Sequence, residues 1–330
     1  MAGILITGAT GFVGTHLVEA IARNGLRARA LVRETSDTGA LRKHGIERVV
    51  GDLTDPAALR RAVRDADTVL HLAAATRSLA PAGFHAVNAE GTGQLVRAMT
   101  EAGGGRLVYL SSLAAVGPRR DRPVRPDDPP RPLTVYGSSK LEGERRVRSG
   151  VGVSSAILRA PAVYGPGDRD LLPFFRLANR GVLPVIGSLE RQLQLVHVRD
   201  LARAILAAAR SSATGVFHIA EPRAYTWAQV LELMATAVDR PGTRVRVPDV
   251  IMRLAATASE AAARIVRRAA IFDRDKAREL LAPGWTCETD VARRAFGFEA
   301  STPLADGLRE TADWYRNAGW LPKRGRNRGR

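Results

Sequence analysis

A tyrosine and a lysine four residues apart are the pair in this sequence best suited to moving a proton. Tyr136 and Lys140 lie in Tyr136-Gly137-Ser138-Ser139-Lys140, and this spacing puts both side chains on one face of a helix. A neighbouring positive charge favours the phenolate, so we expect the pKa of Tyr136 to be lowered toward working pH. Ser112 ends a predicted strand earlier in the chain. Its hydroxyl would complete the contacts to a reacting oxygen.

Three regularly spaced glycines form a second motif near the start of the chain. Gly8, Gly11 and Gly14 follow the apolar run Ile4–Ile6 and open a helical stretch. Glycines at these positions allow a tight turn and a close backbone approach to a pyrophosphate. The N-terminus of the helix adds unpaired N–H groups and a positive dipole end. The motif therefore predicts dinucleotide binding.

The ends of the second and third predicted strands bear on which dinucleotide is bound. The second strand ends in Val32-Arg33, without the carboxylate that would accept hydrogen bonds from a ribose 2′-hydroxyl. Arg33 can instead form a forked contact with a 2′-phosphate, although Glu34 beside it argues the other way. We therefore expect NADP to be favoured over NAD. Asp52, which closes the third strand, is placed to accept from the adenine amine.

Strands and helices alternate over the first 160 residues, and this order predicts the fold. The predicted strands are Ile4–Ile6, Ala28–Val32, Arg48–Val50, Thr68–Leu72, Arg106–Leu110 and Ser155–Leu158. Alternation of this kind indicates an α/β fold with a Rossmann-type, doubly wound parallel sheet covered on both faces. Val216–Ile219 reads as one more strand of the same sheet, so we expect a smaller, discontinuous C-terminal substrate domain.

These elements suggest a division of the chain. The predicted dinucleotide-binding domain comprises residues 1–164 and 193–220, and the predicted substrate-binding domain comprises 165–192 and 221–322. Residues 323–330 form a basic tail. The proline-rich segment Gly117–Pro132 is expected to be an exposed loop. The Ala-rich, amphipathic stretch Val250–Ala270 is predicted to be a packing helix or a lid, with contact to a membrane surface as the alternative.

Composition narrows the class of protein. The chain has 330 residues, 45% of them hydrophobic and 25% charged, and a formal net charge of +17. This composition suits a folded core and argues against global disorder. The basic residues are scattered and the basic tail carries no aromatic residue, so we expect no specific nucleic-acid partner. A single cysteine, Cys287, excludes an internal disulfide and fits a cytoplasmic protein.

The motifs together resemble the extended short-chain dehydrogenase/reductase family, also called the NAD-dependent epimerase/dehydratase family. The resemblance covers about residues 1–220, and its pieces occur in family order. They are Thr7–Gly14, Gly51–Leu53, His71–Ala74, Asn88–Thr92, Leu110–Ser112, Tyr136–Lys140, Leu158–Pro161, Val163–Gly167 and Val196–Leu201.

The resemblance implies a role for each matching residue. Tyr136 would be the general acid/base, Lys140 would hold the nicotinamide ribose, and Ser112 would hydrogen-bond the reacting oxygen. Asn88 would be a structural contact near the site. The implied cofactor contacts are Gly8, Thr10, Gly11, Phe12, Val13, Gly14, Arg33, Asp52, Leu53, Leu72, Ala73, Ala74, Tyr136, Lys140, Pro161 and Val163.

One position departs from the pattern of the family's nucleotide-sugar enzymes. They usually carry an arginine that grips the substrate diphosphate just before the strand matching Leu195–Val198, and this chain has Leu193 there. Arg191 lies two residues away, which on a strand is a shift of about 6–7 Å. The sequence is more similar to the hydroxysteroid-dehydrogenase-like, flavonol-reductase-like and hopanoid-associated branches.

Three functions follow in order of preference. The first is an NAD(P)-dependent oxidoreductase acting on a secondary alcohol or ketone of a small molecule, with no metal. The second is a nucleotide-sugar epimerase or dehydratase, and the third is a non-catalytic dinucleotide-binding accessory subunit. The third is disfavoured because the chain keeps Tyr136 and Lys140. The resemblance also implies a homodimer, formed by the helices around Ala86–Thr100 and Tyr136–Ser149.

Overall fold

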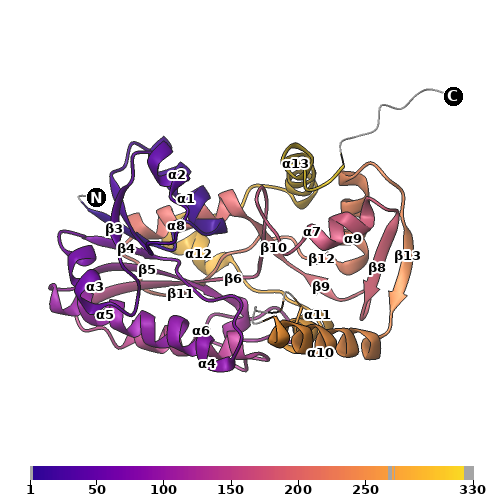
Figure 1. Ribbon diagram of the computed structural model, residues 1–330, viewed down its shortest axis with the longest axis horizontal. Helices are drawn as coiled ribbons and strands as arrows, with labels where there is room; N and C mark the ends of the chain where they lie inside the picture. Colours follow the sequence, from indigo (N-terminus) through magenta and orange to yellow (C-terminus); the bar gives the residue numbers. More distant parts are fainter. Residues whose placement is uncertain (1–2, 267–269, 271, 323–330) are drawn as a thin grey trace.

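Seven parallel strands form the central sheet of the larger half of the protein (Figure 1). The computed structural model describes residues 3–266, 270 and 272–322. The sheet has the order β11-β6-β5-β4-β1-β2-β3. Its strands are β1 (Ile4–Thr7), β2 (Ala28–Val32), β3 (Glu47–Val50), β4 (Thr68–His71), β5 (Gly105–Ser112), β6 (Val153–Ala160) and β11 (Gly215–His218). The predicted Rossmann-type sheet is confirmed.

The direction of strand order reverses at β1, which pairs with β2 on one side and β4 on the other. Ile4 lies opposite Ala28 of β2 and Thr68 of β4 in parallel register. In sheets of this type, ligands bind beyond the carboxyl ends of the strands at such a reversal. The glycine turn after β1 and the turn after β4 both lie at this edge.

Helices cover both faces of the sheet (Figure 1). One face carries α1, α2, α8 and α12, and the other carries α3, α5 and α6. Their bounds are α1 (Phe12–Arg23), α2 (Gly39–Lys43), α3 (Pro56–Val63), α5 (Thr92–Glu101), α6 (Val135–Arg148), α8 (Val198–Arg210) and α12 (Asp290–Phe296). Between β4 and α5 run α4 (Pro81–His85) and a π-helical turn, η1 (Ala86–Gly91). The 3₁₀ turn η2 (Leu113–Ala115) follows β5.

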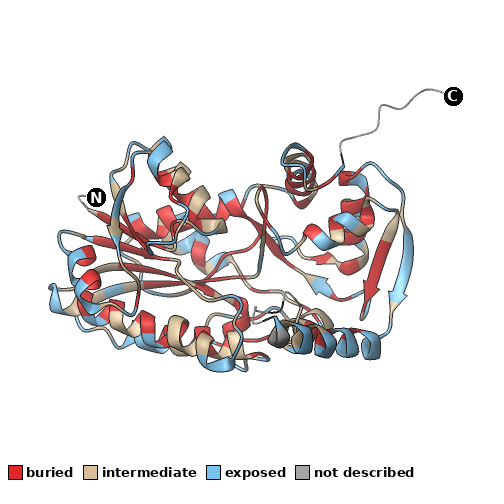
Figure 2. Ribbon diagram, in the orientation of Figure 1, coloured by how far each residue is buried: buried red, intermediate tan, exposed pale blue. Residues whose placement is uncertain are grey.

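Local sequence explains where these helices begin and what they bury. The side chain of Asp55 accepts hydrogen bonds from the N–H groups of Ala57 and Ala58, both at 3.0 Å, so it caps α3 as its sequence suggests. On α1, Leu17 and Ile21 are one turn apart and fully buried against the sheet. Apolar residues at helical spacing therefore orient the helices, and Figure 2 shows their sheet-facing sides in red.

The smaller half is built from short strand pairs and helices around its own core. Parallel pairs join β7 to β10 and β8 to β13, and an antiparallel pair joins β9 to β12. The bounds are β7 (Ala162–Tyr164), α7 (Leu172–Ala178), β8 (Val182–Ile186), β9 (Gln192–Leu193), β10 (Leu195–His197), β12 (Tyr225–Thr226), α9 (Trp227–Ala237), β13 (Thr243–Val247), α10 (Asp249–Ile265), α11 (Arg274–Leu281) and α13 (Leu304–Asn317). Phe175, Leu231 and Tyr315 lie in this core.

Two segments differ from the sequence prediction. The proline-rich segment Gly117–Pro132 is not simply an exposed loop, because Val124 is wholly buried and exchanges backbone hydrogen bonds with Thr286 and Glu288. The helix α12 lies against the edge strand β11, although its residues fall in the range assigned to the substrate domain. The rings of Phe217 and Phe296 meet there at 5.1 Å, so α12 packs on one face of the edge strand.

Two further sequence predictions concern membrane-spanning helices and the basic tail. Among the described residues, no helix combines the length and the apolar character needed to cross a bilayer. The basic tail, 323–330, lies outside the described residues.

Candidate active site

The glycine turn after β1 forms an open cradle at the N-terminus of α1. Gly8 has φ of +76°, and a Cβ there would come within 2.6 Å of the backbone nitrogen of Ala73. A Cβ on Gly14 would lie 2.1 Å from the carbonyl oxygen of Gly8. Gly11 is exposed and serves as the N-cap of α1 without any side-chain cap. The first N–H groups of this helix are therefore directed at an anion site, as dinucleotide binding requires.

The remaining predicted cofactor contacts line the same edge of the sheet. Thr10, Phe12 and Val13 are partly buried at the start of α1. Partly buried residues also follow β4 and β6 at their carboxyl ends. They are Leu72, Ala73, Ala74, Pro161 and Val163.

The tips of β2 and β3 place Arg33 beside Asp52. Arg33 is exposed, and its positive charge contributes to lowering the pKa of Asp52, after the hydrogen bonds from Thr54. Asp52 Oδ1 accepts from the backbone N–H of Thr54 at 2.7 Å and from its hydroxyl at 2.6 Å. Leu53, next in the chain, is buried against Gly91.

Ser112, Tyr136 and Lys140 converge between β5 and the first turns of α6. Thr134 caps α6 by accepting from the N–H of Gly137 at 3.0 Å, which fixes the turn that carries Tyr136. The hydroxyl of Ser112 hydrogen-bonds the Tyr136 side chain. Its neighbour Ser111 donates to Glu144, about two turns further along α6.

The pKa of Tyr136 in the protein alone is shifted upward. Burial raises this pKa above its usual value, Glu279 raises it further, and the hydrogen bond from Ser112 lowers it. The expected lowering included the positive charge of a bound nicotinamide, so it stays a prediction for the protein with its cofactor. Removal of the phenol from water outweighs any influence of the lysine, so Tyr136 is a protonated phenol at neutral pH.

Lys140 is buried at the centre of the site, with 1% of its surface exposed. Its Nζ donates to the carbonyl oxygen of Leu110 at 2.7 Å and lies 4.2 Å from the centre of the Tyr109 ring. Burial lowers the pKa of Lys140 to about 7, and Glu144 opposes the shift. The ammonium is therefore poised to change its charge near neutral pH.

The π-helical turn η1 ties the catalytic helix to the turn after β4 through Asn88. The wholly buried Asn88 donates to the Ala75 carbonyl at 3.0 Å and to the Ser139 hydroxyl at 2.9 Å. Its Oδ1 accepts from the N–H of Ala75 at 2.8 Å. This set of contacts fits the structural role that the family resemblance implies.

A buried ion pair lies beneath the site, and the sequence analysis did not predict it. Arg159 donates to Glu144 through two nitrogens, at 2.9 and 2.7 Å, and Ser111 donates to the same carboxylate at 2.6 Å. Glu144 follows Lys140 by one helical turn, and that spacing is the signal that could have revealed it. The network fixes α6 to both β5 and β6.

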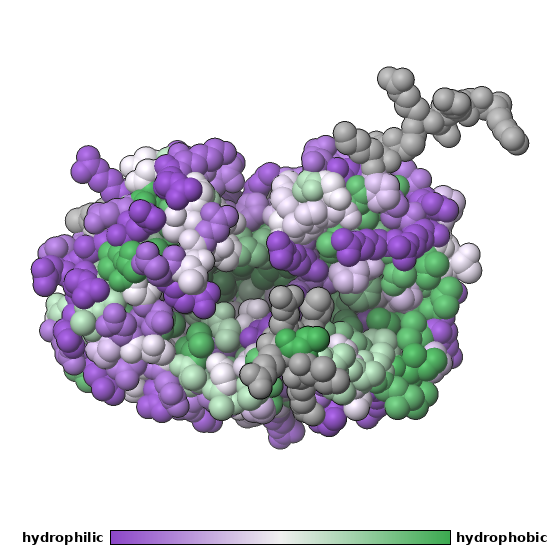
Figure 3. All heavy atoms as spheres, in the orientation of Figure 1, coloured by the Kyte–Doolittle hydropathy of each residue, from purple (hydrophilic) through white to green (hydrophobic). Residues whose placement is uncertain are grey.

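The smaller half closes over the site from the opposite side. Glu279 of α11 and Asp170 both influence the pKa of Tyr136, which places them near it. Arg77, from the turn after β4, forms an ion pair with Asp170 at 2.7 Å. Phe84 meets the Tyr136 ring edge-on at 6.2 Å. Figure 3 shows the surface hollowed between the two halves in this region.

Arg191 and Leu193 both make contacts within the smaller half. Leu193 on β9 packs at the edge of the smaller core. The Arg191 guanidinium donates to the Leu280 carbonyl and stacks over the Trp227 ring at 4.8 Å. Burial lowers the pKa of Arg191 to about 10. Arg191 is thus already engaged within the fold, and it is not poised as the diphosphate-binding cation that Leu193 fails to supply.

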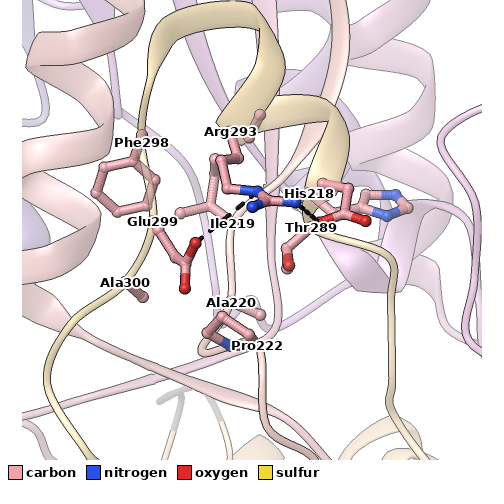
Figure 4. A pocket seen from close by; sticks show the side chains of 11 residues that line it. His218, Ile219, Ala220, Pro222, Thr289, Arg293, Phe298, Glu299 and Ala300 are labelled. Carbon is pink, nitrogen blue, oxygen red and sulfur yellow. Dashed lines mark hydrogen bonds and ion pairs between the residues drawn. The ribbon is translucent and has the colours of Figure 1, made fainter.

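Two other cavities lie away from these residues. One of about 250 Å³ lies between β11 and α12, and Figure 4 shows Arg293 across its mouth, paired with Asp290 at 3.0 Å and Glu299 at 3.9 Å. The other, of about 620 Å³, lies at the amino ends of the strands beside Gly103–Gly105. Neither is lined by Tyr136 or the glycine cradle.

The remaining reactive side chains occupy structural positions. His71 is buried between the hydroxyls of Thr7 and Thr92, at 2.6 and 2.9 Å, and burial lowers its pKa to about 3. His197 is also buried, with its pKa lowered to about 4. Burial raises the pKa of the Cys287 thiol to about 12. No group of three His, Cys, Asp or Glu residues within the described part of the chain could hold a metal ion.

Comparison with known proteins identifies the family. The NAD dependent epimerase/dehydratase family matches residues 4–220, about two thirds of the chain. The chain belongs to this family. Within it, a ceramide reductase from Caulobacter vibrioides is 36% identical over 323 residues, covering 97% of this chain and 96% of its own length. The expected family and an enzymatic character are confirmed.

Two further members of the family are similar along almost the whole chain. A 2-alkyl-3-oxoalkanoate reductase from Stenotrophomonas maltophilia is 27% identical, covering 93% of this chain and 97% of its own. The structure of MoeE5 in complex with UDP-glucose and NAD superposes with a TM-score of 0.74 and 27% identity, covering 96% and 99% of the two chains. The family thus includes reductases and an NAD-bound protein that holds a nucleotide sugar.

Proposed function

We propose that this protein is an NADP-preferring reductase that converts a ketone on an alkyl-chain substrate to a secondary alcohol. The observation that carries the proposal is the meeting of Ser112, Tyr136 and Lys140 in a site where the two candidates for a diphosphate-binding residue are unsuitable. Leu193 has no charge, and Arg191 is engaged with Leu280 and Trp227.

A reduction requires a hydride and a proton, and the site has a candidate proton donor. When bound, the nicotinamide supplies the hydride that adds to the carbonyl carbon. Tyr136 Oη donates its proton to the carbonyl oxygen, and Ser112 Oγ hydrogen-bonds the same oxygen. A phenol whose pKa is raised by burial is already in the proton-donating form at neutral pH. Lys140 then stabilises the phenolate until a proton returns from solvent.

The cofactor preference rests on Arg33. Its exposed guanidinium follows β2, at the edge where the adenosine ribose of a dinucleotide would lie. It can form a forked contact with a 2′-phosphate. Gly8 and Gly14 allow the turn to pack closely on its own backbone, and the N-terminus of α1 at Gly11 has no side-chain cap. Its N–H groups suit the pyrophosphate, so the residues present fit the group.

The substrate class rests on the missing cation and on two relatives. Burying a diphosphate without a fixed positive partner costs several kcal/mol. The names of the two related reductases describe substrates that carry alkyl chains. The alternative is a nucleotide-sugar enzyme, which the similarity to MoeE5 with UDP-glucose favours.

Two measurements on the purified protein separate these functions. Consumption of NADPH is followed with a 2-alkyl-3-oxoalkanoate, and calorimetry measures binding of UDP and UDP-glucose. We expect reduction of the ketone and no micromolar binding of either nucleotide. Micromolar binding of UDP-glucose without ketone reduction would replace this proposal by the epimerase alternative. Leu193→Arg is the matched variant, and it should strengthen UDP binding by adding a bidentate phosphate partner.

The assembly and cell compartment belong to the same proposal. We place the enzyme in the cytoplasm as a homodimer, with α5 and α6 of each copy forming the interface. Sedimentation of the purified protein at several concentrations tests this state, and a monomer at all of them would contradict it.

A further inference from the structure

The helix α10 presents a row of large apolar side chains to solvent. Val250, Ile251 and Leu254 are 61%, 52% and 64% exposed, and Val266, just beyond the helix, is 62% exposed. Figure 2 shows the outer side of α10 in pale blue along its length. Side chains of this size and exposure, gathered on one element, mark an interaction site.

The exposed apolar residues share one face of the helix, which we call the α10 face. At about 100° per residue they fall within an arc of roughly 140°, and exposed alanines fill the spaces between them. The α10 face consists of Val250, Ile251, Leu254, Ala255, Ala258, Ala261 and Ala262.

The opposite side of α10 accounts for the packing that was predicted from the sequence. Met252 and Ala256 are buried there, against α11. Glu260 accepts from the backbone N–H of Arg274 at 2.8 Å and pairs with its guanidinium at 3.3 Å. The helix is therefore held in place by its inner side, which leaves the α10 face without a partner in the described chain.

Positive charge surrounds the α10 face. Arg253 is exposed on the flank of the helix, and Arg246 is exposed on β13, the edge strand that runs directly into α10. Arg244, also exposed on β13, forms an ion pair with Glu232. Figure 3 shows apolar residues in green at the lower right, where β13 meets α10, with hydrophilic residues nearby in purple. An apolar face flanked by arginines is the pattern of helices that lie in the interface of an anionic bilayer.

The α10 face is also close to the catalytic residues. α10 packs on α11, and Asp275 of α11 accepts from the backbone N–H of Val135 at 2.6 Å, one residue before Tyr136. From the same helix, Glu279 acts on Tyr136 itself. One layer of helix therefore separates the α10 face from the reaction site.

We propose that the α10 face docks the enzyme on the surface of an anionic phospholipid bilayer. Docking would place the cleft beside the leaflet in which an alkyl-chain substrate resides. The purpose of this docking rests on the proposed function, whereas the docking itself is a property of the surface.

Charge selects the bilayer over a second copy of this chain. The protein carries a formal net charge of +17, so two copies that met through arginine-flanked faces would repel each other. A bilayer that contains anionic lipid offers apolar depth and negative charge together.

The test measures co-sedimentation of the full chain with phosphatidylglycerol/phosphatidylcholine vesicles and with pure phosphatidylcholine vesicles, without substrate. We expect binding to the anionic vesicles that weakens with added salt. The combined variant Val250→Ser, Ile251→Ser and Leu254→Ser should reduce this binding at least about tenfold, because three apolar side chains leave the interface. The matched control is Val151→Ser, whose side chain is 77% exposed on the turn after α6.

A second measurement covers the case in which the triple variant fails to fold. Cys287 is the single cysteine and is buried, so Leu254→Cys introduces one exposed thiol for an environment-sensitive dye. We expect the emission of this dye to shift to the blue with anionic vesicles, and the same dye on Val151→Cys to stay unchanged. Equal responses from both positions would overturn the proposal.

Further outcomes of the vesicle and activity measurements also decide between the proposal and its alternatives. Wild-type protein that stays in the supernatant, or a triple variant that binds as wild type does, overturns the proposal. Loss of self-association in the triple variant without vesicle binding would assign the α10 face to a second copy instead. Ketone reduction without vesicle binding would refute docking and leave the proposed function intact, and vesicle binding without reductase activity would do the reverse.

Discussion

At the scale of single residues, the site is defined by ionisable groups that have been withdrawn from water. Tyr136 and Lys140 are both shifted toward their neutral forms by burial. In the proposed reaction, Ser112 and the substrate oxygen are the immediate hydrogen-bond partners of Tyr136. Their chemistry therefore depends on what enters the cleft.

Tyr136→Phe removes the proton donor while keeping the ring. We expect turnover to fall by at least about 10²-fold, the usual size of a general acid contribution. Cofactor affinity, measured by fluorescence titration, should stay within about twofold. Turnover near the wild-type value would remove Tyr136 from the mechanism.

Lys140→Met should separate stability from activity. Between its folded pKa of about 7 and its ordinary value of 10.5, the unfolded chain holds a proton that the folded protein has released. The free energy of unfolding therefore rises with pH between about 7 and 10.5. Below about pH 7 the buried ammonium of Lys140 is charged, and the folded protein bears the full cost of burying that charge. We expect the variant to lose activity and to gain thermal stability at neutral pH, on the order of a few kcal/mol. If the melting temperature of the variant rose with pH as steeply as that of the wild type, this assignment would be contradicted.

Arg33→Ser tests the cofactor preference. Losing one charge-assisted contact should weaken NADP binding by about 10- to 100-fold, whereas NAD binding should hardly change. Arg27→Ser, at the exposed opposite end of β2, is the control and should alter neither. Tighter binding of NAD than of NADP by the wild type would refute the preference.

At the scale of elements, the π-helical turn η1 and the end of the parallel strand β6 hold α6, the helix that carries Tyr136. Asn88 is directed at α6 by η1, where the extra residue of the π turn re-aims the side chain. The ion pair of Glu144 and Arg159 holds the same helix from below. The position of Tyr136 therefore depends on two polar supports that are buried.

Asn88→Ala should loosen this arrangement. It leaves the N–H and carbonyl of Ala75 without their partner, so we expect a loss of about 2–3 kcal/mol in the free energy of unfolding together with reduced turnover. Urea denaturation and steady-state kinetics measure the two effects. The control Asn24→Ala, at the exposed end of α1, should stay within about 0.5 kcal/mol of wild type.

The sequence was sufficient for the sheet and for the motifs that end its strands. Short apolar runs gave the strands because a parallel sheet buried on both faces needs continuous apolar residues. The glycine spacing and Tyr136–Lys140 lie within single local segments, so they could be read directly. The Glu144–Arg159 pair, the contact of Val124 with 286–288 and the site-facing Glu279 join segments far apart, and only the folded chain brings them together. The raised pKa of Tyr136 in the protein alone could not be read from the sequence for the same reason, because burial is a tertiary property.

At the scale of the whole molecule, the two halves meet at the cleft through an exposed ion pair. Arg77 and Asp170 face each other at 2.7 Å, with 38% and 58% of their side chains exposed. A pair this open contributes only about 0–1 kcal/mol to stability. Because the pair bridges the two halves near Tyr136, we expect its removal to affect turnover more than folding.

Arg77→Gln should therefore change kinetics and leave the fold intact. We expect thermal stability within about 0.5 kcal/mol of wild type and a turnover that no longer varies with ionic strength, since the screened contact is gone. Arg125→Gln breaks an exposed pair with Glu288 away from the cleft and should leave the salt dependence in place. A salt profile unchanged by Arg77→Gln would argue against this pair as a link between the halves.

The last strand of the large sheet has a consequence for how the chain acquires its structure. β11 pairs with β6 only after the chain has passed through α7, β8 and β9 of the smaller half and returned. During synthesis, the edge of β6 therefore waits unpaired while more than fifty residues emerge. Such long-range parallel pairing is slow to form. A ribosome-bound chain that stops before Gly215 should expose β6 as a site for chaperone capture or misassociation, and one extended past Phe298 should be protected.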